Sequence, residues 1–186
     1  NCNEHISEAY IDSVLPHFEK GDILVIQNEI NNLHLIIEKA KAAGLIIVFN
    51  PSPYNHVIET LPMDKIDYLF INEVEGRQLS GSDNEKEIPR LILERYPAIK
   101  VILTLGERGA VYADENQYVY EPAIKTEVVD TVGAGDTFTG YFIYGIMSRK
   151  SVKECLNMAS TASSIVIGRH GAGNSIPTLD EVEKAL

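Results

Sequence analysis

The sequence is poor in the residues that build disulfide frameworks and zinc sites. Its two cysteines, Cys2 and Cys155, lie far apart, no C-x-x-C spacing occurs, and the five histidines are scattered. This pattern argues against both kinds of site and is typical of a reducing compartment, so we expect a cytoplasmic protein.

Long apolar runs are also missing. No run approaches the roughly 20 residues needed to span a bilayer, and residues 1–8 are too polar for a signal peptide. We therefore expect neither a membrane segment nor export.

Basic residues are the minority among the charged ones, with 16 Lys and Arg against 27 Asp and Glu and a formal net charge of −11. Such a surface would repel nucleic acids and anionic membranes, so we expect neither as a partner, and an anionic ligand would need a local site.

The 186 residues, 45% of them hydrophobic, suit a single domain over residues 1–186 with a sizeable core.

The most informative stretch is residues 130–138, Asp-Thr-Val-Gly-Ala-Gly-Asp-Thr-Phe. It follows a β-branched run, Thr126 to Val129, and leads into apolar residues at helical spacing from Phe138 to Met147. The pattern predicts a strand, a glycine turn and a helix start. Because glycines allow close approach and the first N–H groups of a helix lack partners, we expect an anion to bind there.

Asp136 stands inside this predicted anion site. An Asp at a helix start usually caps the helix, but next to a phosphate it can also accept a proton from an incoming hydroxyl. A dinucleotide fingerprint G-x-G-x-x-G does not fit, because Phe138 stands where the third glycine would be.

The stretch resembles the C-terminal signature of the ribokinase-like (PfkB-type) carbohydrate kinases, which transfer the γ-phosphoryl group of ATP to a sugar or nucleoside hydroxyl. The resemblance implies an α/β fold, a three-layer Rossmann-type sandwich with a mainly parallel sheet. It also implies that Asp136 is the catalytic base and that Gly133, Ala134 and Gly135 form the anion hole.

The resemblance also implies that the chain is a C-terminal fragment. The chain starts at Asn1 rather than Met, and the family's N-terminal sugar-binding segment and lid have no counterpart in it. We expect the fragment to carry the ATP site and the catalytic base, and to turn over little or nothing alone.

Apolar runs and helical spacing predict alternating strands and helices along the chain. The expected strands are 22–26, 45–49, 67–71, 100–105 and a hairpin of 110–113 and 117–120; the expected helices are 7–18, 31–44, 72–79, 85–96, 138–147, 152–167 and 178–186.

Polar residues follow several of these strands. Glu29 is by default a solvated charge, but the resemblance implies that it contacts a sugar hydroxyl, so that it binds the substrate together with Asp136. Asn72 and Glu75 have the spacing of a capping box, while the resemblance implies that they help to hold Mg²⁺, largely through water, and the nucleotide phosphates. The two roles are compatible.

The segment Thr104 to Gly109 reads as a hairpin turn and resembles the family's Thr-x-Gly-x-x-Gly segment, which lines the nucleotide site. Ser160 stands where many members place Asn or His near the adenine. The implied ATP contacts are Asn72, Thr104, Gly106, Gly109, Gly135 and Ser160.

The glycine-rich loop at residues 168–175 is most simply a flexible connection. Many members of the family bind a monovalent cation such as K⁺ there, mostly through carbonyl oxygens. The matching residues are Asp130, Val132, Val166, Arg169, Gly171 and Ser175.

The resulting hypothesis is ATP-dependent phosphorylation of a primary hydroxyl on a small sugar or nucleoside by direct in-line transfer. ATP, Mg²⁺ and K⁺ are the implied cofactors, a polyhydroxyl compound is the substrate, and the full-length protein is expected to form a homodimer. The alternatives are a noncatalytic nucleotide-binding module, either this fragment or a degenerate kinase, and an unrelated Rossmann-type oxidoreductase.

Overall fold

The computed structural model describes residues 2–186, so Asn1 and the side chain of Cys2 lie outside the described residues. The chain forms two compact units. Among the described residues, one unit comprises residues 2–103 with Ala113–Gln117, and the other comprises Thr104–Tyr112 with Tyr118–Leu186. Because such units need not fold independently, the single domain expected over residues 1–186 stays a prediction.

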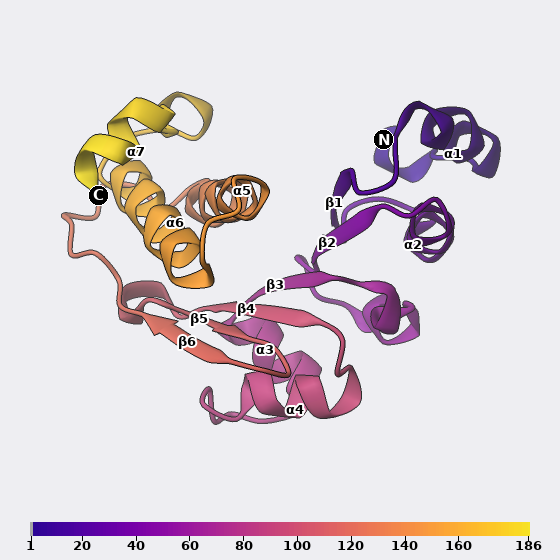
Figure 1. Cartoon of the computed structure of the whole chain (residues 1–186), viewed down its shortest axis with the longest axis horizontal. Helices are drawn as coiled ribbons and strands as arrows, with labels where there is room; N and C mark the ends of the chain where they lie inside the picture. The colour runs from indigo at the N-terminus through magenta and orange to yellow at the C-terminus, as the bar shows by residue number, and fades with distance from the viewer. Residues whose placement is uncertain (1) are drawn as a thin grey trace. The chain divides into compact units, whose positions relative to one another are not determined.

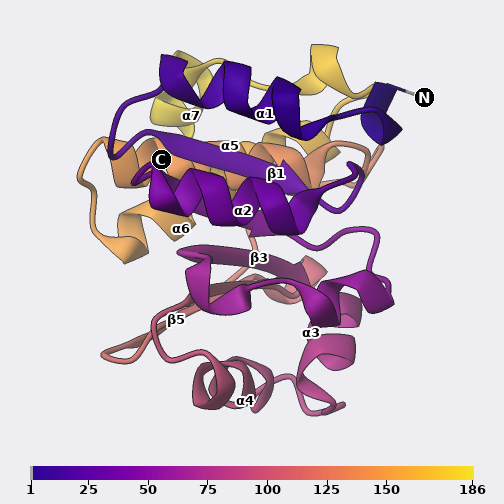
Figure 2. The same ribbon diagram turned by 90° about the vertical axis from the view of Figure 1, so that its right-hand side faces the viewer.

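The first unit alternates strands and helices (Figures 1 and 2). Its strands lie next to one another in the order β1 (Ile23–Gln27), β2 (Ile46–Asn50), β3 (Tyr68–Asn72) and β4 (Lys100–Thr104, whose last residue belongs to the second unit). The pairs β1–β2 and β2–β3 are parallel. The helices are α1 (Glu8–Val14), α2 (Leu33–Ala42), α3 (Glu73–Ser80) and α4 (Ile88–Arg95).

Apolar spacing explains how these elements pack. Strand β2 buries Ile47 and Phe49 completely, and α2 contacts β2 through the apolar face that includes Ile37 and Ala40, both fully buried. Gly44, at φ +84°, follows α2 in the left-handed conformation that commonly ends helices. The parallel strands with intervening helices confirm the predicted α/β class.

The second unit contains three helices and most of two strands, whereas the turn that joins these strands, at residues 113–117, belongs to the first unit (Figure 1). Strands β5 (Ala110–Ala113) and β6 (Tyr118–Glu121) are neighbours in the sheet, joined by a short turn. Helix α5 (Ala134–Met147) packs on α6 (Val152–Ile167), and α7 (Leu179–Ala185) packs on α6. A Cβ at Gly145 would lie 2.8 Å from Cys155 Sγ, so glycine permits the close α5–α6 contact.

Short 3-10 turns complete the secondary structure. They are Cys2–Glu4, Leu15–His17, His56–Thr60, Met63–Lys65, Gly106–Arg108 and Gly173–Ser175. Within the described residues, no helix is long and apolar enough to cross a membrane.

One predicted strand is wrong. Residues 126–129 form neither strand nor helix, and the exposed fractions of Val128 and Val129 are 62% and 41%. Instead, Val129 N donates to the carbonyl oxygen of Ile167 at the end of α6, at 2.7 Å. A β-branched run forms a strand only where a neighbouring strand can pair with it.

The predicted first helix is too long, although Ser7 caps it as expected, its Oγ accepting from Tyr10 N at 3.2 Å. The α-helix ends at Val14 and a 3-10 turn containing Pro16 follows, because proline cannot donate the N–H that a continuing helix needs. Phe18, expected on the buried face, is 49% exposed.

Candidate functional site

The first turn of α5 is where the sequence predicts an anion site. Gly133 precedes the helix at φ +79°, a left-handed conformation that favours glycine, and the helical hydrogen bonds begin with Thr137 N donating to Gly133 O at 2.9 Å. Gly135 and Asp136 therefore lie in the first turn, whose N–H groups lack intrahelical acceptors. Apart from the adjoining residues and the backbone of α5 itself, no atom of the described residues lies within 4 Å of where a Cβ on Gly135 would lie, so a ligand can approach this backbone closely.

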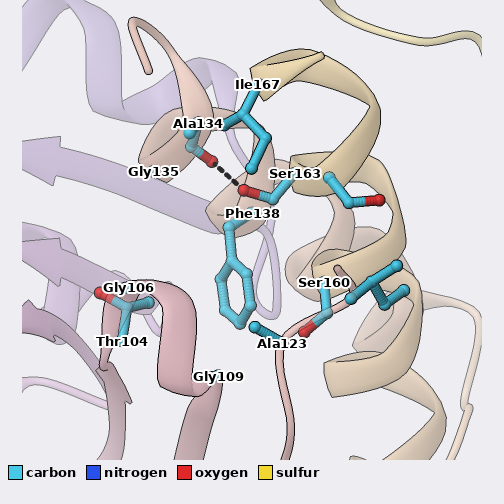
Figure 3. Close-up of a pocket in the computed structure, with 12 residues that line it drawn as sticks. Thr104, Gly106, Gly109, Ala123, Ala134, Gly135, Phe138, Ser160, Ser163 and Ile167 are labelled. Atoms are coloured by element: carbon cyan, nitrogen blue, oxygen red, sulfur yellow. Dashed lines mark hydrogen bonds between the residues drawn. The ribbon is translucent and has the colours of Figure 1, made fainter. Parts of the chain in front are cut away.

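A cavity of about 190 Å³ lies beside this turn (Figure 3). It is lined by residues at the end of β4, the following glycine turn, the segment after β6, the start of α5 and one face of α6. Its lining residues are Thr104, Gly106, Gly109, Ala123, Ile124, Ala134, Gly135, Phe138, Ser160, Ser163, Ser164 and Ile167. All twelve belong to the second unit.

Hydrogen bonds hold the walls of the cavity. Ser163 Oγ donates to Ala134 O at 3.2 Å, which joins α6 to the first turn of α5 (Figure 3). In the glycine turn, Leu105 N donates to Gly109 O at 2.8 Å. Gly109 has φ +103°, and a Cβ there would lie 2.1 Å from the carbonyl oxygen of Glu121. Only glycine fits this position.

The cavity brings together five of the six residues implied as ATP contacts, namely Thr104, Gly106, Gly109, Gly135 and Ser160. The sixth, Asn72, belongs to the first unit. The binding roles of all six stay predictions, as does the anion hole of Gly133, Ala134 and Gly135.

Sequence reasoning missed half of the lining. The spacing of Ser160, Ser163, Ser164 and Ile167 along α6 is that of one helical face, so the first of them could have led to the others. Ala123 and Ile124 carry no such signal, because they lie in an irregular segment.

Asp136, the predicted base, is exposed. It lies at the edge of a second, mainly apolar hollow of about 350 Å³ formed by α5 and the residues around α7. The other lining residues are Thr137, Gly140, Tyr141, Tyr144, Ile176 and Leu179. Thr137 is 4% exposed, and its Oγ1 has no hydrogen-bond partner within the described part of the chain. The catalytic role of Asp136 stays a prediction.

The expected capping box at the start of α3 is confirmed. Asn72 Oδ1 accepts from Val74 N at 2.9 Å and from Glu75 N at 3.0 Å, while Glu75 Oε2 accepts from Asn72 N at 3.0 Å. Glu75 is only 5% exposed. The cap does not use Asn72 Nδ2 or Glu75 Oε1, so it leaves room for the predicted part in Mg²⁺ binding.

Glu29, the predicted substrate contact, is exposed just beyond β1. Its neighbour Asn28 fixes this segment, since Asn28 Nδ2 donates to Pro53 O at 2.6 Å and Asn28 N donates to Ser52 O at 3.2 Å. The segment at residues 51–53, which follows β2, thus holds the end of β1 in place.

The residues implied for a monovalent cation lie on two segments joined by Asp130. Its carboxylate accepts from Val132 N at 3.0 Å and from Gly171 N at 3.3 Å. Both hydrogen bonds lower the pKa of Asp130, and the bond from Val132 N has the larger effect. On the second segment, Val166 O accepts from Arg169 N at 2.9 Å, and Ser175 O accepts from the Arg169 side chain at 3.4 Å. The cation role of these residues stays a prediction.

Groups of three or more His, Cys, Asp or Glu side chains that could hold a metal ion are not found among the described residues. A Mg²⁺ ion that keeps several waters needs only one or two carboxylates, so the predicted Mg²⁺ site does not require such a group.

Comparison with models of protein families identifies the family of the chain. The model of the pfkB family carbohydrate kinases matches residues 3–179, so the chain belongs to this family. The resemblance of residues 130–138 to the family signature is thereby confirmed.

Known ribokinases match along the whole chain. The ribokinase of Lactococcus lactis is 32% identical over 187 residues, covering 100% of this chain and 60% of the relative. The crystal structure of Thermotoga maritima ribokinase is 30% identical with a TM-score of 0.85, covering 98% of this chain and 62% of that one. Arabidopsis thaliana ribokinase, solved with ribose and ATP, is 26% identical with a TM-score of 0.84 over 98% of this chain and 62% of its own.

These structural matches confirm the predicted ribokinase-like fold. The chain spans about 60% of the length of the curated relatives that it matches.

Proposed function

We propose that this chain carries the ATP site and the catalytic base of a sugar kinase that phosphorylates a primary hydroxyl. The observation that carries the proposal is the cavity beside the first turn of α5, because Gly135 lines it and Asp136 lies on the same turn. Membership of a carbohydrate kinase family and similarity to a ribokinase solved with ribose and ATP support it.

The chemistry assigned to the chain is general base catalysis with electrostatic stabilisation. Asp136 accepts the proton of the attacking hydroxyl, and the N–H groups of Gly133 to Gly135, with the α5 dipole, hold the negative charge of the transferred group. Bound ATP supplies the phosphoryl group, and Mg²⁺ neutralises charge on its oxygens. Transfer is direct, so no phospho-enzyme forms.

Asn72 and Glu75 are assigned to Mg²⁺ and the phosphates in addition to their cap. Glu75→Gln tests this second role, because Gln can still accept from Asn72 N in a capping box but carries no charge. We expect an unchanged melting temperature and a weaker dependence of ATP affinity on Mg²⁺. If the ATP affinity of Glu75→Gln depended on Mg²⁺ as strongly as that of the wild type, Glu75 would have no role beyond capping α3.

Asp130, Val132, Val166, Arg169, Gly171 and Ser175 are assigned to K⁺. The Asp130 carboxylate joins both segments, which suits a cation held by one carboxylate and several carbonyl oxygens. A cation bound at Ser175 O would compete with the Arg169 side chain. We expect K⁺ to raise the melting temperature more than Na⁺ does, and Asp130→Asn to abolish the difference.

The acceptor proposed is ribose or a related small sugar, with Glu29 contacting one of its hydroxyls. The expected homodimer of the full-length protein, its cytoplasmic location, and the exclusion of nucleic acids and membranes as partners stay predictions.

The proposal is tested in a protein that includes the portion of the relatives that this chain does not span. We expect ADP release that requires ribose, and a loss of turnover of two orders of magnitude or more in Asp136→Asn with nucleotide affinity retained. Absence of sugar-dependent ADP release, or full turnover in Asp136→Asn, would contradict it. The chain of residues 1–186 alone is expected to turn over little or nothing.

A noncatalytic nucleotide-binding module is the second candidate, because the cavity beside α5 can hold a nucleotide whether or not Asp136 acts as a base. It predicts that ATP binds but that no ADP is released even when the remaining portion is present.

A further inference from the structure

We infer that the cavity beside α5 accepts the base of a nucleoside triphosphate without selecting between amino and keto bases, so that GTP binds about as well as ATP. The inference rests on the proposed function, since it assumes that the cavity holds a nucleotide. The phosphates belong at the first turn of α5, and a cavity of about 190 Å³ then leaves room mainly for the nucleoside.

Apolar side chains and glycine backbone dominate the walls of the cavity. Phe138 and Ile167 line it together with Gly106 and Gly109 (Figure 3). Ile124 is a further apolar lining residue. Such walls bury either face of a flat base, and this contact is available to every base because each has a π-face. Burial therefore gives affinity and little selectivity.

Two of the serine hydroxyls that line the cavity already donate hydrogen bonds to backbone carbonyl oxygens. Ser163 Oγ donates to Ala134 O, and Ser164 Oγ donates to Thr161 O at 2.8 Å, so both oxygens act as acceptors toward a ligand. They can accept from the amino group of adenine or from the ring N–H and amino group of guanine. Ser160 is 8% exposed, and its hydroxyl has no partner within the described residues. Because a hydroxyl both donates and accepts, Ser160 can pair with the amino group of adenine or the keto group of guanine.

The glycine turn at residues 106–109 offers few further groups that could form hydrogen bonds with the base. Gly109 N donates to Gly106 O at 3.1 Å, and Gly109 O accepts from Leu105 N. Among the lining residues that the structure describes, none has an amide, carboxylate, imidazole or cationic side chain. A site built to hydrogen-bond one edge discriminates on the order of 10⁴-fold or more, and this cavity lacks such groups in fixed orientation.

Calorimetric titration of the chain with Mg-ATP and Mg-GTP tests the inference. We expect dissociation constants that differ by less than tenfold. A difference of tenfold or more would overturn the inference alone and would point to the backbone of residues 123–124 as the reader of the base. Absence of binding by both nucleotides would instead overturn the proposed nucleotide site.

Ser160→Ala provides the second measurement. Loss of one hydroxyl contact should weaken ATP and GTP alike, each roughly fivefold, so that the ratio of their affinities changes less than threefold. A threefold or larger change in the ratio would show that Ser160 selects the base and would overturn the inference. Ser148→Ala, at an exposed serine outside the cavity, is the control and should leave both affinities unchanged.

Discussion

The hydroxyl of Ser163 on α6 donates a hydrogen bond of 3.2 Å to the carbonyl oxygen of Ala134 in the first turn of α5. This contact ties the wall of the cavity to the turn whose N–H groups are proposed to hold phosphate. The position of the turn thus depends on a residue almost 30 positions further along the chain.

Ser163→Ala removes this tie. We expect the free energy of unfolding to fall by about 1 kcal/mol, the usual net value of one hydrogen bond. Urea denaturation measures the change. An unfolding free energy equal to that of the wild type would mean that the bond contributes nothing to the α5–α6 packing.

Thr137→Val should stabilise the protein. Thr137 Oγ1 is buried without a hydrogen-bond partner among the described residues, and leaving such a hydroxyl unsatisfied costs about 1–3 kcal/mol. Valine has a similar shape and lacks the oxygen, so the melting temperature should rise by several degrees. Thr139→Val, at a less buried position of the same helix, is the control and should have little effect. A lower melting temperature for Thr137→Val would reveal a partner for the hydroxyl.

The α6 capping box should make stability depend on pH. Hydrogen bonds from the Ser151 hydroxyl and N–H lower the pKa of Glu154 below its ordinary value of 4.5. As pH falls below 4.5, the unfolded chain binds a proton before the folded chain does, so this stabilisation is lost as pH falls through the folded pKa.

Melting temperatures of Glu154→Gln from pH 7 to pH 3 check this dependence. The advantage of the wild type over the variant should be full above pH 5 and should shrink below pH 4.5. Glu183→Gln, at an exposed glutamate outside the capping boxes, controls for general charge effects. A constant difference between wild type and Glu154→Gln would contradict the account.

Local signals explain which elements could be predicted. Helix α6 has the predicted bounds, Val152–Ile167, because Ser151 and Glu154 mark its start and Gly168 follows its end. The run Thr126–Val129 misled, because strand formation depends on a neighbour that a local pattern cannot reveal.

The site shows the same division. Gly135 and Ser160 were found through a signature and its neighbourhood, whereas Ala123 and Ile124 reach the cavity only through tertiary packing. The sequence likewise could not predict that the Thr137 hydroxyl lacks a hydrogen-bond partner among the described residues, because hydrogen bonding of a buried group depends on the residues packed around it.

Helix α5 offers a matched pair of variants for the nucleotide site. Gly135 and Gly140 both lie in α5, and an added Cβ at either would have no atom of the described residues within 4 Å, apart from adjoining residues and the backbone of α5. Ala at each position should fold and gain about 0.5–1 kcal/mol of stability. Of the two, only Gly135 lines the cavity beside the first turn. Only Gly135→Ala therefore places a methyl group where the nucleotide is proposed to contact the protein backbone.

Titration of the chain with Mg-ATP, for the wild type and these two variants, is the most direct test of the proposed nucleotide site. The account predicts that the wild type and Gly140→Ala bind with equal affinity and that Gly135→Ala binds at least tenfold more weakly with no loss of melting temperature. Equal binding by all three proteins, or none by the wild type, would contradict it.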